Sequence, residues 1–559
     1  MKIRLEQLNP IIGDIDGNSR KISEALKKAE ASGIDLLILQ EMVLTGYPLQ
    51  DLIEKDHFRK YCYRENEKII ESTDKTALLF GTVTPNNEQK GRKMYNSALL
   101  ARGGELLGIT HKTLLPTYDV FDDLRYFEPN KEFECIELDG VNFGITICED
   151  IWYNENEVQY HYYDINPAKV LANKGADIIV NISASPFTAT KHENRIEMLK
   201  KHARSLSLPV LYCNQTGAHT ELVFDGDSIA INGEGIQVSH TTPFEEDFTD
   251  VEYNPSEKKL KALPDQKTEV YPQTKDERLF RASVCGIRDY FRKTGVTDQA
   301  VIGLSGGIDS SLTAVLAVEA LGTDNVTGIT MPAEYSSAGS VTDSEKLTEN
   351  LGIRIHNISI HDIVDAFGKS LHPLFKDTEF GVAEENIQSR IRGTLLMAYA
   401  NKYGCLLITT GNKSEYAVGY ATMYGDMNGA LAPIGDMYKT EVFSLSNWLN
   451  NHYFKKEVIP NNVLEKPPSA ELRPGQKDTD SLPEYEILDD ILYRYLELLQ
   501  SENEISKNYD NVTVREVLHL VNNNEFKRYQ AAPILKMTSK SFGSGRRMPL
   551  VQKWKGHRI

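Results

Sequence analysis

The 559-residue sequence lacks the features that mark membrane, secreted and nucleic-acid-binding proteins. It has no run of about 18 apolar residues, and its N-terminus has no apolar signal-peptide core, so we expect neither a membrane partner nor secretion. Its six cysteines include no CxxC pair, which predicts reduced thiols and a cytoplasmic protein. A net charge of -18 argues against nucleic acid as the main partner.

The length predicts two to four domains rather than one core. Both halves alternate short apolar runs with helical patterns, which indicates the α/β class. Around residues 246–275 the periodicity is lost and Pro, Glu, Lys and Thr accumulate. We therefore expect a linker over 246–275, between a domain at 1–245 and a domain at 276–559.

A glycine turn separates an apolar strand from a helix near residue 305. Residues 300–304 form the apolar run, and Gly306 and Gly307 let successive backbone N–H groups face one space, toward which the next helix points its positive end. This geometry binds an anionic phosphate. The Walker lysine of GxxxxGK[ST] is missing and Asp309 stands there instead, which favours Mg²⁺ bridging the phosphates.

Three polar residues follow apolar strands in the first half of the chain. Glu41 comes after the run 36–40, Lys112 after 108–111 and Cys148 after 144–147. Because strand ends of α/β folds meet at a shared crevice, we expect the three side chains to converge. A thiol attacks a carbonyl, a carboxylate takes its proton, and an ammonium stabilises the oxyanion and the thiolate.

The sequence segments around these residues resemble the signature segments of the nitrilase or carbon-nitrogen hydrolase superfamily. Residues 40–48, 111–118 and 147–152 match the three segments in order, and 181–187 resembles the next. Over residues 1–245 the resemblance implies an αββα sandwich. It also implies that Glu41, Lys112 and Cys148 form a triad that hydrolyses an amide through a thioester.

The chain departs from that pattern at two positions. His111 stands where an arginine is common, and Asp123 stands where a glutamate is common, so the sequence does not define a role for Asp123. Resemblance to the glutaminase branch implies that Tyr118, Ser185 and Lys191 contact the amino-acid end of glutamine.

The second half carries a different set of motifs. Apolar runs at 326–330, 353–358 and 406–409 recur at helix-sized intervals, which predicts a doubly wound parallel sheet. The loop 305–311, SGGIDSS, resembles the pyrophosphate-binding loop of the N-type ATP pyrophosphatases, whose sheet is Rossmann-like. Further segments resemble NAD synthetase; they are 385–393, 409–415, 424–426, 433–440 and 468–476.

Together the two motif sets resemble the glutamine-dependent NAD synthetases over nearly the whole chain. The resemblance implies ATP contacts from the phosphate loop, from the end of a later strand and from a lysine. It implies deamido-NAD contacts from a helix, from two acidic residues and from the C-terminal segment, and a Mg²⁺ site formed by two carboxylates. The implied ATP contacts are Gly303, Leu304, Ser305, Gly306, Gly307, Ile308, Asp309, Ser310, Thr410 and Lys439; the deamido-NAD contacts are Asn386, Arg390, Glu415, Asp426 and Lys536; the metal ligands are Asp309 and Glu415.

The implied reaction uses glutamine, ATP and deamido-NAD. Glutamine hydrolysis releases ammonia, which travels by an enclosed route, and ATP adenylates the nicotinate carboxylate before ammonia displaces AMP. The family also implies a homo-oligomer built on a synthetase dimer. One alternative keeps the ATP chemistry with another carboxylate or carbonyl acceptor; others are an RNA-binding or tRNA-thiolating protein on the same loop, or a scaffold with inactive sites.

The tail from residue 526 to 559 has no acidic residue and nine Lys or Arg. Such a run is typical of a nucleic-acid arm. In a chain of this net charge that resembles enzymes of polyanionic substrates, we favour a tail that closes the substrate cleft.

Overall fold

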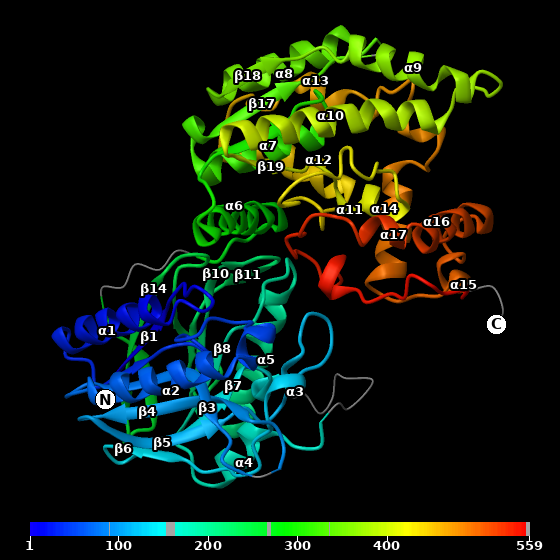
Figure 1. Ribbon diagram of the computed structural model, residues 1–559. Helices are drawn as coiled ribbons and strands as arrows, with labels where there is room; N and C mark the ends of the chain where they lie inside the picture. Colours follow the sequence, from blue (N-terminus) through cyan, green and yellow to red (C-terminus); the bar gives the residue numbers. More distant parts are fainter. Residues whose placement is uncertain (89, 153–162, 265–269, 335, 474, 555–559) are drawn as a thin grey trace. The chain divides into compact units, whose positions relative to one another are not determined.

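The computed structural model describes residues 1–88, 90–152, 163–264, 270–334, 336–473 and 475–554 (Figure 1). The chain divides into two compact units, Met1–Gln273 and Thr274–Ile559. Within the described ranges, every helix is too short or too polar to span a lipid bilayer.

The N-terminal unit contains two large sheets. The first has seven strands, in the spatial order β15 (Lys259–Ala262), β14 (Asp247–Asn254), β1 (Lys2–Gln7), β2 (Leu36–Ile38), β3 (Ala77–Pro85), β4 (Met94–Arg102) and β5 (Glu105–His111). The second has six strands, in the order β13 (Gln237–His240), β12 (Ile229–Ile231), β9 (Val210–Asn214), β8 (Ile178–Ser183), β7 (Val141–Ile147) and β6 (Ile136–Leu138). The strands β10 (Thr216–His219) and β11 (Leu222–Asp225) form a separate hairpin.

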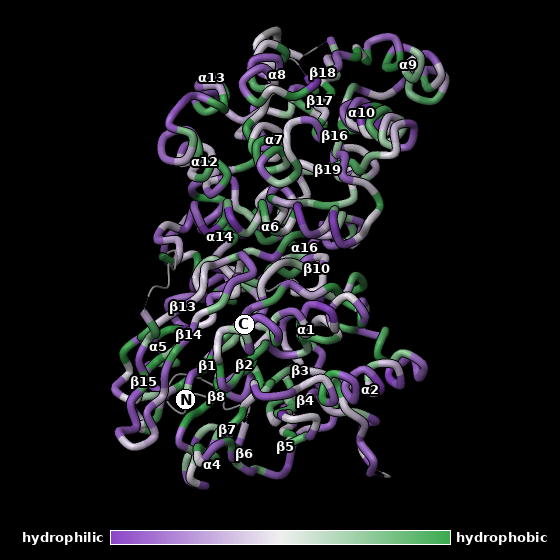
Figure 2. The backbone as a smooth tube through the Cα atoms, turned by 90° about the vertical axis from the view of Figure 1, so that its left-hand side faces the viewer, coloured by the Kyte–Doolittle hydropathy of each residue, from purple (hydrophilic) through white to green (hydrophobic). Residues whose placement is uncertain are grey.

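Side-chain alternation explains why the two sheets stack. In β2, Leu36 and Ile38 join the core between the sheets, whereas Leu37 faces the helices α1 (Ile15–Ala31) and α2 (Asp56–Glu71). Both helices show mixed polar and apolar colouring, as expected of helices with one buried face (Figure 2).

The outer face of the second sheet is covered in the same way. The helices α4 (Pro167–Asn173) and α5 (Lys191–Leu206) pack there in a third cluster that includes Leu171 and Leu199. The layers are therefore helix, sheet, sheet, helix, and the predicted αββα sandwich is confirmed.

The expected linker over 246–275 is wrong for residues 247–262. These residues form β14 and β15, and β14 pairs antiparallel with β1 from Lys2 opposite Glu252 to Gln7 opposite Asp247. Strand β15 is an edge strand whose charged side chains face solvent, and a charged edge strand resembles a loop in composition. Residues 265–269 of the expected linker lie outside the described residues.

The C-terminal unit is built on a parallel sheet of four strands. Their order is β18 (Arg354–Asn357), β17 (Val326–Thr330), β16 (Ala300–Gly303) and β19 (Leu406–Ile408). The chain winds from β16 to β17 to β18 and then returns to the far side of β16, so strand order reverses between β16 and β19. Ligands of such sheets bind at this reversal, beyond the carboxyl ends of the strands. The predicted doubly wound parallel sheet is confirmed.

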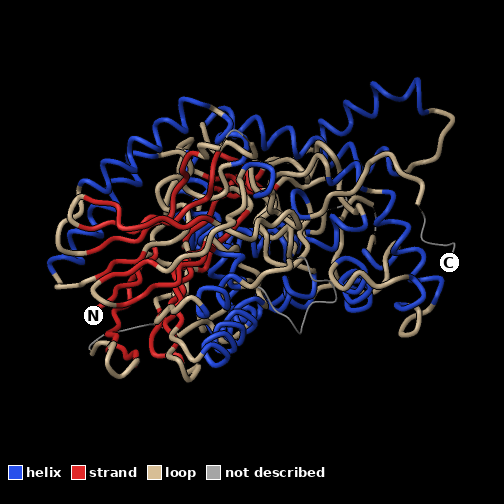
Figure 3. Tube along the Cα trace, turned by 90° about the horizontal axis from the view of Figure 1, so that it is seen from below, coloured by secondary structure: helices blue, strands red, loops and turns tan. Residues whose placement is uncertain are grey.

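Helices and the loops between them form the rest of the C-terminal unit; Figure 3 draws the helices in blue and the loops in tan. The connecting helices are α6 (Lys275–Thr294), α7 (Ile308–Leu321), α8 (Ala338–Leu351), α9 (His361–Phe375) and α10 (Val382–Tyr403). A further helical layer has its own core of Leu488, Ile491 and Val517. Its helices are α11 (Lys413–Val418), α14 (Tyr485–Leu496), α15 (Glu502–Ile505), α16 (Asn511–Asn523) and α17 (Glu525–Arg528). Helix α12 (Lys439–Trp448) contacts α6 and α7, and α13 (Asn461–Glu465) is hydrogen-bonded to α8.

The earlier part of the basic tail packs into this unit, whereas Leu550, Val551 and Trp554 near its end are exposed. Ala432 bridges to Ile534, and Lys527 donates hydrogen bonds to the carbonyls of Gly419 and Ala421. The Arg528 guanidinium is buried and donates to the carbonyls of residues 416, 417 and 521. Several of these cations therefore stabilise backbone carbonyls within the unit. Residues 555–559 lie outside the described residues.

Candidate active sites

Cys148 stands on a strained turn at the end of β7. Its φ of 48° is in the left-handed region, which costs a non-glycine residue about 1 kcal/mol and is found mainly at functional positions. A 3₁₀ turn, Cys148–Ile151, follows at once. The Asp150 carboxylate accepts hydrogen bonds from the N–H groups of Ile147, Thr113 and Leu114. This carboxylate therefore ties the Cys148 turn to the segment that follows Lys112.

Glu41 is held by hydrogen bonds on both carboxylate oxygens. Oε1 accepts from the Asn96 side-chain amide at 2.7 Å, and Oε2 accepts from the Ala184 N–H at 2.7 Å. Gly81 of β3 makes the close approach possible, because a Cβ there would lie 2.5 Å from the Glu41 Cα atom. Glu41 is fully buried, so its orientation is set by these partners.

Lys112 lies between two carboxylates. Its Nζ is 2.8 Å from Glu41 Oε1 and 2.7 Å from Asp123 Oδ2, and Tyr47 donates a hydrogen bond to the other Asp123 oxygen at 3.0 Å. Burial alone would lower the pKa of Lys112, but Asp123 and Glu41 raise that pKa well above its ordinary value. Lys112 therefore stays charged in a buried site.

The Cys148 thiol lies within the electrostatic reach of both residues. Burial raises the pKa of Cys148, Glu41 raises it further, and Lys112 lowers it by less. Lys112 therefore favours the thiolate, as expected, but burial and Glu41 outweigh it and the net direction is upward. The resting group is a thiol, which needs a base such as Glu41 to become a nucleophile.

Two polar pairs lie near this thiol. The Tyr118 hydroxyl donates to both oxygens of Glu149, at 2.8 and 3.0 Å. Lys191, the first residue of α5, donates from Nζ to Ser185 Oγ at 2.7 Å and lies over the Trp152 ring. Glu149 raises and Lys191 lowers the pKa of Cys148, which places one negative and one positive group around the sulfur.

The phosphate loop lies between β16 and α7 in the C-terminal unit. Gly306 has a φ of 71°, and a Cβ there would lie 2.2 Å from the Ser340 carbonyl oxygen, so only glycine fits. The Gly307 N–H donates to Ser305 Oγ at 3.2 Å, and Ser310 Oγ donates to the Gly307 carbonyl. Gly307 caps a 14-residue helix without a side chain of its own, which leaves the positive helix end facing the loop.

Lys439 joins the two predicted metal ligands. Its Nζ is 2.6 Å from Asp309 Oδ2 and 3.2 Å from Glu415 Oε1. Asp309 begins α7 after β16, and Glu415 lies on α11 after β19, so the reversal of strand order brings them together. Burial alone would lower the pKa of Lys439, but Asp309 and Glu415 raise it, and burial raises the pKa of Glu415 to about 8. Thr410 lies half-buried just after β19.

Three of the predicted deamido-NAD residues meet around residues 422–426. Thr422 donates to Asn386 Oδ1 at 2.9 Å, Arg390 donates to the Met423 carbonyl at 3.3 Å, and Asp426 accepts from Ser389 at 2.9 Å. Glu415 belongs instead to the Asp309 and Lys439 cluster. Lys536 is buried and donates to the carbonyls of residues 538 and 539, and no contact described in the structure joins it to Asn386.

Comparison with known proteins gives two family matches and full-length relatives. Residues 2–257 match the carbon-nitrogen hydrolase family, and residues 279–531 match the NAD synthase family. A glutamine-dependent NAD(+) synthetase from Synechocystis sp. is 46% identical over 98% of both chains. One from Thermotoga maritima is 40% identical over 99% of both chains. The chain belongs to the glutamine-dependent NAD(+) synthetases. A solved structure supports this. The glutamine-dependent NAD+ synthetase from Acinetobacter baumannii, in complex with ADP, is 34% identical in sequence. The comparison has a TM-score of 0.78 and covers 100% of this chain and 99% of that chain.

As a glutamine-dependent NAD synthetase, the chain is a ligase that forms a carbon–nitrogen bond. It hydrolyses glutamine to ammonia and uses the ammonia to amidate deamido-NAD, while ATP goes to AMP and pyrophosphate. The relatives do not favour the alternative of another acceptor. We call residues 1–273 the glutaminase unit and residues 274–559 the synthetase unit.

The sequence did not assign several residues that hold the glutaminase site together. Asn96 orients Glu41, Tyr47 orients Asp123, and Asp150 orients the Cys148 turn. The sequence left the role of Asp123 undefined; in the structure it forms a direct ion pair with Lys112. Glu149 directly follows Cys148 in the matched motif, and that position was the available signal. The direction of its side chain depends on the 3₁₀ turn, which the sequence did not predict.

The donor set around Asp309 fits Mg²⁺ that also binds substrate phosphates. Mg²⁺ in such sites takes one or two carboxylates from the protein and completes its shell with phosphate oxygens and water. Asp309 and Glu415 supply two carboxylates on either side of Lys439 Nζ. Among the described residues, no group of three or more His, Cys, Asp and Glu side chains forms a metal cage. The residues therefore fit a metal that arrives with ATP.

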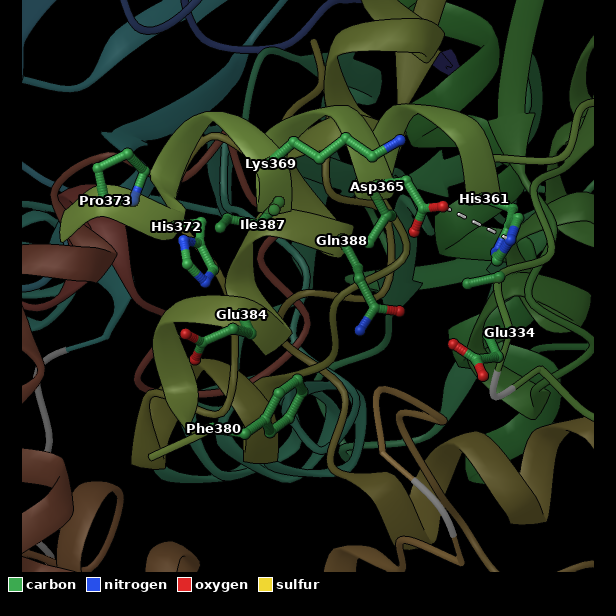
Figure 4. Close-up of a pocket in the computed structure, with 13 residues that line it drawn as sticks. Glu334, His361, Asp365, Lys369, His372, Pro373, Phe380, Glu384, Ile387 and Gln388 are labelled. Carbon is green, nitrogen blue, oxygen red and sulfur yellow. Dashed lines mark ion pairs between the residues drawn. The ribbon is translucent and has the colours of Figure 1, made fainter. Parts of the chain in front are cut away.

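The synthetase unit also has a pocket of about 630 Å³ between α9 and α10 (Figure 4). Glu334, Asp365, Lys369 and Glu384 give it a mixed charge, and His361 and Asp365 of its lining lie within ion-pair distance of each other. Among the described residues, none of the predicted ATP or deamido-NAD contacts lines this pocket.

Proposed function

We propose that Cys148, Glu41 and Lys112 carry out the glutamine hydrolysis. The observation that supports this most directly is the 2.8 Å ion pair of Glu41 and Lys112 in the buried surroundings of the Cys148 thiol. Glu41 accepts the thiol proton as the sulfur attacks the carboxamide carbon, and this proton then goes to the nitrogen that leaves as ammonia. Water cleaves the thioester in the same way, and Lys112 stabilises each oxyanion.

Asp123→Asn is expected to lower the kcat of glutamine hydrolysis about 100-fold, because Lys112 loses a charged partner at 2.7 Å and shifts from its working position. Glutamate release by the purified variant measures the effect. Asp122→Asn, the same change one residue earlier, is the control and should keep activity within about twofold. Equal activity of the two variants would exclude Asp123 from positioning Lys112.

We further propose that glutamine binds with its two charged ends on the two polar pairs near Cys148. Glu149, held by Tyr118, has the charge that binds the α-ammonium, and Lys191, next to Ser185, has the charge that binds the α-carboxylate. One negative and one positive group near the thiol fit an amino acid whose carboxamide must reach it.

This assignment predicts a pH dependence of glutamine binding. Burial lowers the pKa of Lys191 to about 8, and only the protonated form attracts a carboxylate. The KM for glutamine is therefore expected to be constant below pH 8 and to rise about tenfold per pH unit above it. Lys191→Arg keeps the charge at higher pH, so its KM should rise later. Glutamine's own ammonium affects both proteins equally, so coincident curves would show that Lys191 does not bind the carboxylate.

For the synthetase reaction, we propose that the residues from Gly303 to Ser310, with Thr410 and Lys439, bind ATP. The loop N–H groups and the start of α7 face one space at the reversal of strand order, and the related Acinetobacter baumannii structure contains ADP. Asp309 and Glu415 would hold Mg²⁺, which when bound neutralises phosphate charge and makes pyrophosphate a better leaving group. Lys439 adds a positive charge beside the phosphates.

Asn386, Arg390 and Asp426 are proposed to bind deamido-NAD together with Glu415 and Lys536. Asn386 and Arg390 are one helical turn apart on α10, so they present an amide and a guanidinium on one face. A polyanionic dinucleotide needs such donors. The contacts of Asp426 with Ser389 and Thr422 fix the segment opposite that face.

Three further properties of this chain are proposals that rest on the family and on general chemistry. A homo-oligomer built on a synthetase dimer follows from the family resemblance. An enclosed route for ammonia is supported by the protonation of free ammonia at neutral pH, which would remove the nucleophile. A cytoplasmic location is supported by the six cysteines, all of which are free thiols.

A product assay tests these roles together. The full-length protein is incubated with deamido-NAD, ATP and Mg²⁺ and with either glutamine or ammonium, and NAD, AMP, pyrophosphate and glutamate are quantified. The proposed roles require one AMP per NAD with either nitrogen source, and glutamate only with glutamine. Formation of ADP in place of AMP would contradict the adenylation site.

A further inference from the structure

Tyr271 belongs to the short segment that leads into the synthetase unit, but its side chain is buried in the glutaminase unit. It is 4% exposed and lies two residues before the end of that unit. Its ring stacks on the imidazole of His192, with centroids 3.4 Å apart and planes 5° from parallel. His192 is the second residue of α5 and directly follows Lys191. The segment is therefore clamped onto the first turn of the helix that carries Lys191.

The Tyr271 hydroxyl connects to the other side of the same site. It donates to Asp225 Oδ2 at 3.0 Å, and Asn214 Nδ2 donates to Asp225 Oδ1 at 3.4 Å. The Oδ1 atom of Asn214 accepts from the Ser185 N–H at 2.9 Å. Tyr271 is thus joined to Ser185 through two side chains.

The groups around Tyr271 hold a fixed arrangement of charge. Arg195 binds Asp225 with two hydrogen bonds of 3.0 and 2.6 Å and also reaches Asp227 at 3.1 Å. Asp227 in turn lies 2.9 Å from His192 Nδ1. Arg195, Asp225 and Asp227 are all nearly fully buried, so they have no water to replace a lost partner.

We propose that Tyr271 is a positioning residue for glutamine binding, which acts by holding Lys191 and Ser185 in place. The proposal rests on the proposed contacts of those two residues with glutamine. Removing the hydroxyl takes one donor from Asp225 Oδ2, which keeps its bond from Arg195. Removing the ring also takes the stacking partner from His192 at the start of α5. By these contacts, tight glutamine binding requires the Tyr271 side chain in its buried position, and the segment that carries it leads on to α6.

The test uses the full-length protein with ATP and deamido-NAD present. For Tyr271→Phe the KM for glutamine is expected to rise about 3- to 10-fold, and for Tyr271→Ala about 20-fold or more, while kcat stays within about threefold. NAD formation from ammonium should stay within about twofold in both. Tyr253→Phe is the matched control, since its buried hydroxyl has no hydrogen-bond partner among the described residues.

Lys191→Met separates failure of this inference from failure of the proposed glutamine site. A raised KM for Lys191→Met with unchanged KM values for both Tyr271 variants would overturn the role of Tyr271 alone. An unchanged KM for Lys191→Met would overturn the glutamine contacts and with them this inference. If Tyr271→Ala does not fold, the result for Tyr271→Phe decides. Equal losses of NAD formation from glutamine and from ammonium in Tyr271→Phe would show a general structural role and overturn the proposal.

Discussion

Cys148→Ala is expected to abolish NAD formation from glutamine, with a loss of at least about 10⁴-fold, and to leave formation from ammonium within about twofold. In the proposed mechanism the thiol is the nucleophile of the first reaction and takes no part in the second. The alanine side chain fits the strained position at φ 48° no worse than cysteine does, so the turn should persist. Initial rates of NAD formation with each nitrogen source measure the two effects.

Cys135→Ala is the matched control for this change. Cys135 is a half-buried thiol of the same unit whose Sγ contacts the Leu171 carbonyl at 3.5 Å. The control should keep both activities. Equal loss of the glutamine and ammonium reactions in Cys148→Ala would contradict separate sites, and full retention of the glutamine reaction would exclude Cys148 as the nucleophile.

Asp309→Asn is expected to lower NAD formation about 10²- to 10³-fold with either nitrogen source. Asparagine keeps the shape of the side chain and its contact with Asn412, but it removes the charge that pairs with Lys439 at 2.6 Å and that would hold the metal with Glu415. The Cys148 site is in the other unit and keeps all of its residues. Release of AMP and pyrophosphate reports the loss directly.

Asp324→Asn provides the control, because Asp324 is an exposed carboxylate of the same unit in the turn after α7. It should leave both reactions unchanged. If Asp309→Asn releases AMP at the wild-type rate at every Mg²⁺ concentration, low concentrations included, the proposed role of Asp309 beside the phosphates is wrong. Recovery of the variant at higher Mg²⁺ concentration would instead agree with a weakened metal site.

The positions of the main reactive groups could be predicted because they depend on local patterns. Each of Glu41, Lys112 and Cys148 closely follows an apolar run. The first two follow β2 and β5 of the first sheet and Cys148 follows β7 of the second, so the stacking of the two sheets brings these strand ends together. The glycine turn before α7 likewise depends on local conformation, since the φ of 71° at Gly306 is one that glycine adopts readily. The strand, turn and helix there were predicted to within a few residues.

Contacts that cross the fold could not be predicted in the same way. Strand β14 is stabilised by pairing with β1, about 245 residues earlier, and its own charged sequence resembles a linker. The orientation of Asp123 likewise depends on tertiary contacts with Lys112 and Tyr47. That of Tyr271 depends on contacts with His192 and Asp225. Local propensity contains no information on such pairings.

The central claim is that nitrogen liberated at Cys148 in one unit is the nitrogen that enters NAD in the other. A labelling experiment tests this directly. Glutamine labelled with ¹⁵N in its carboxamide is supplied together with unlabelled ammonium, and the mass of the NAD formed is measured by mass spectrometry. The wild-type chain should make NAD with ¹⁵N in the nicotinamide amide, and Cys148→Ala should make only unlabelled NAD. Labelled NAD from Cys148→Ala, or unlabelled NAD from the wild type at saturating glutamine, would contradict the account.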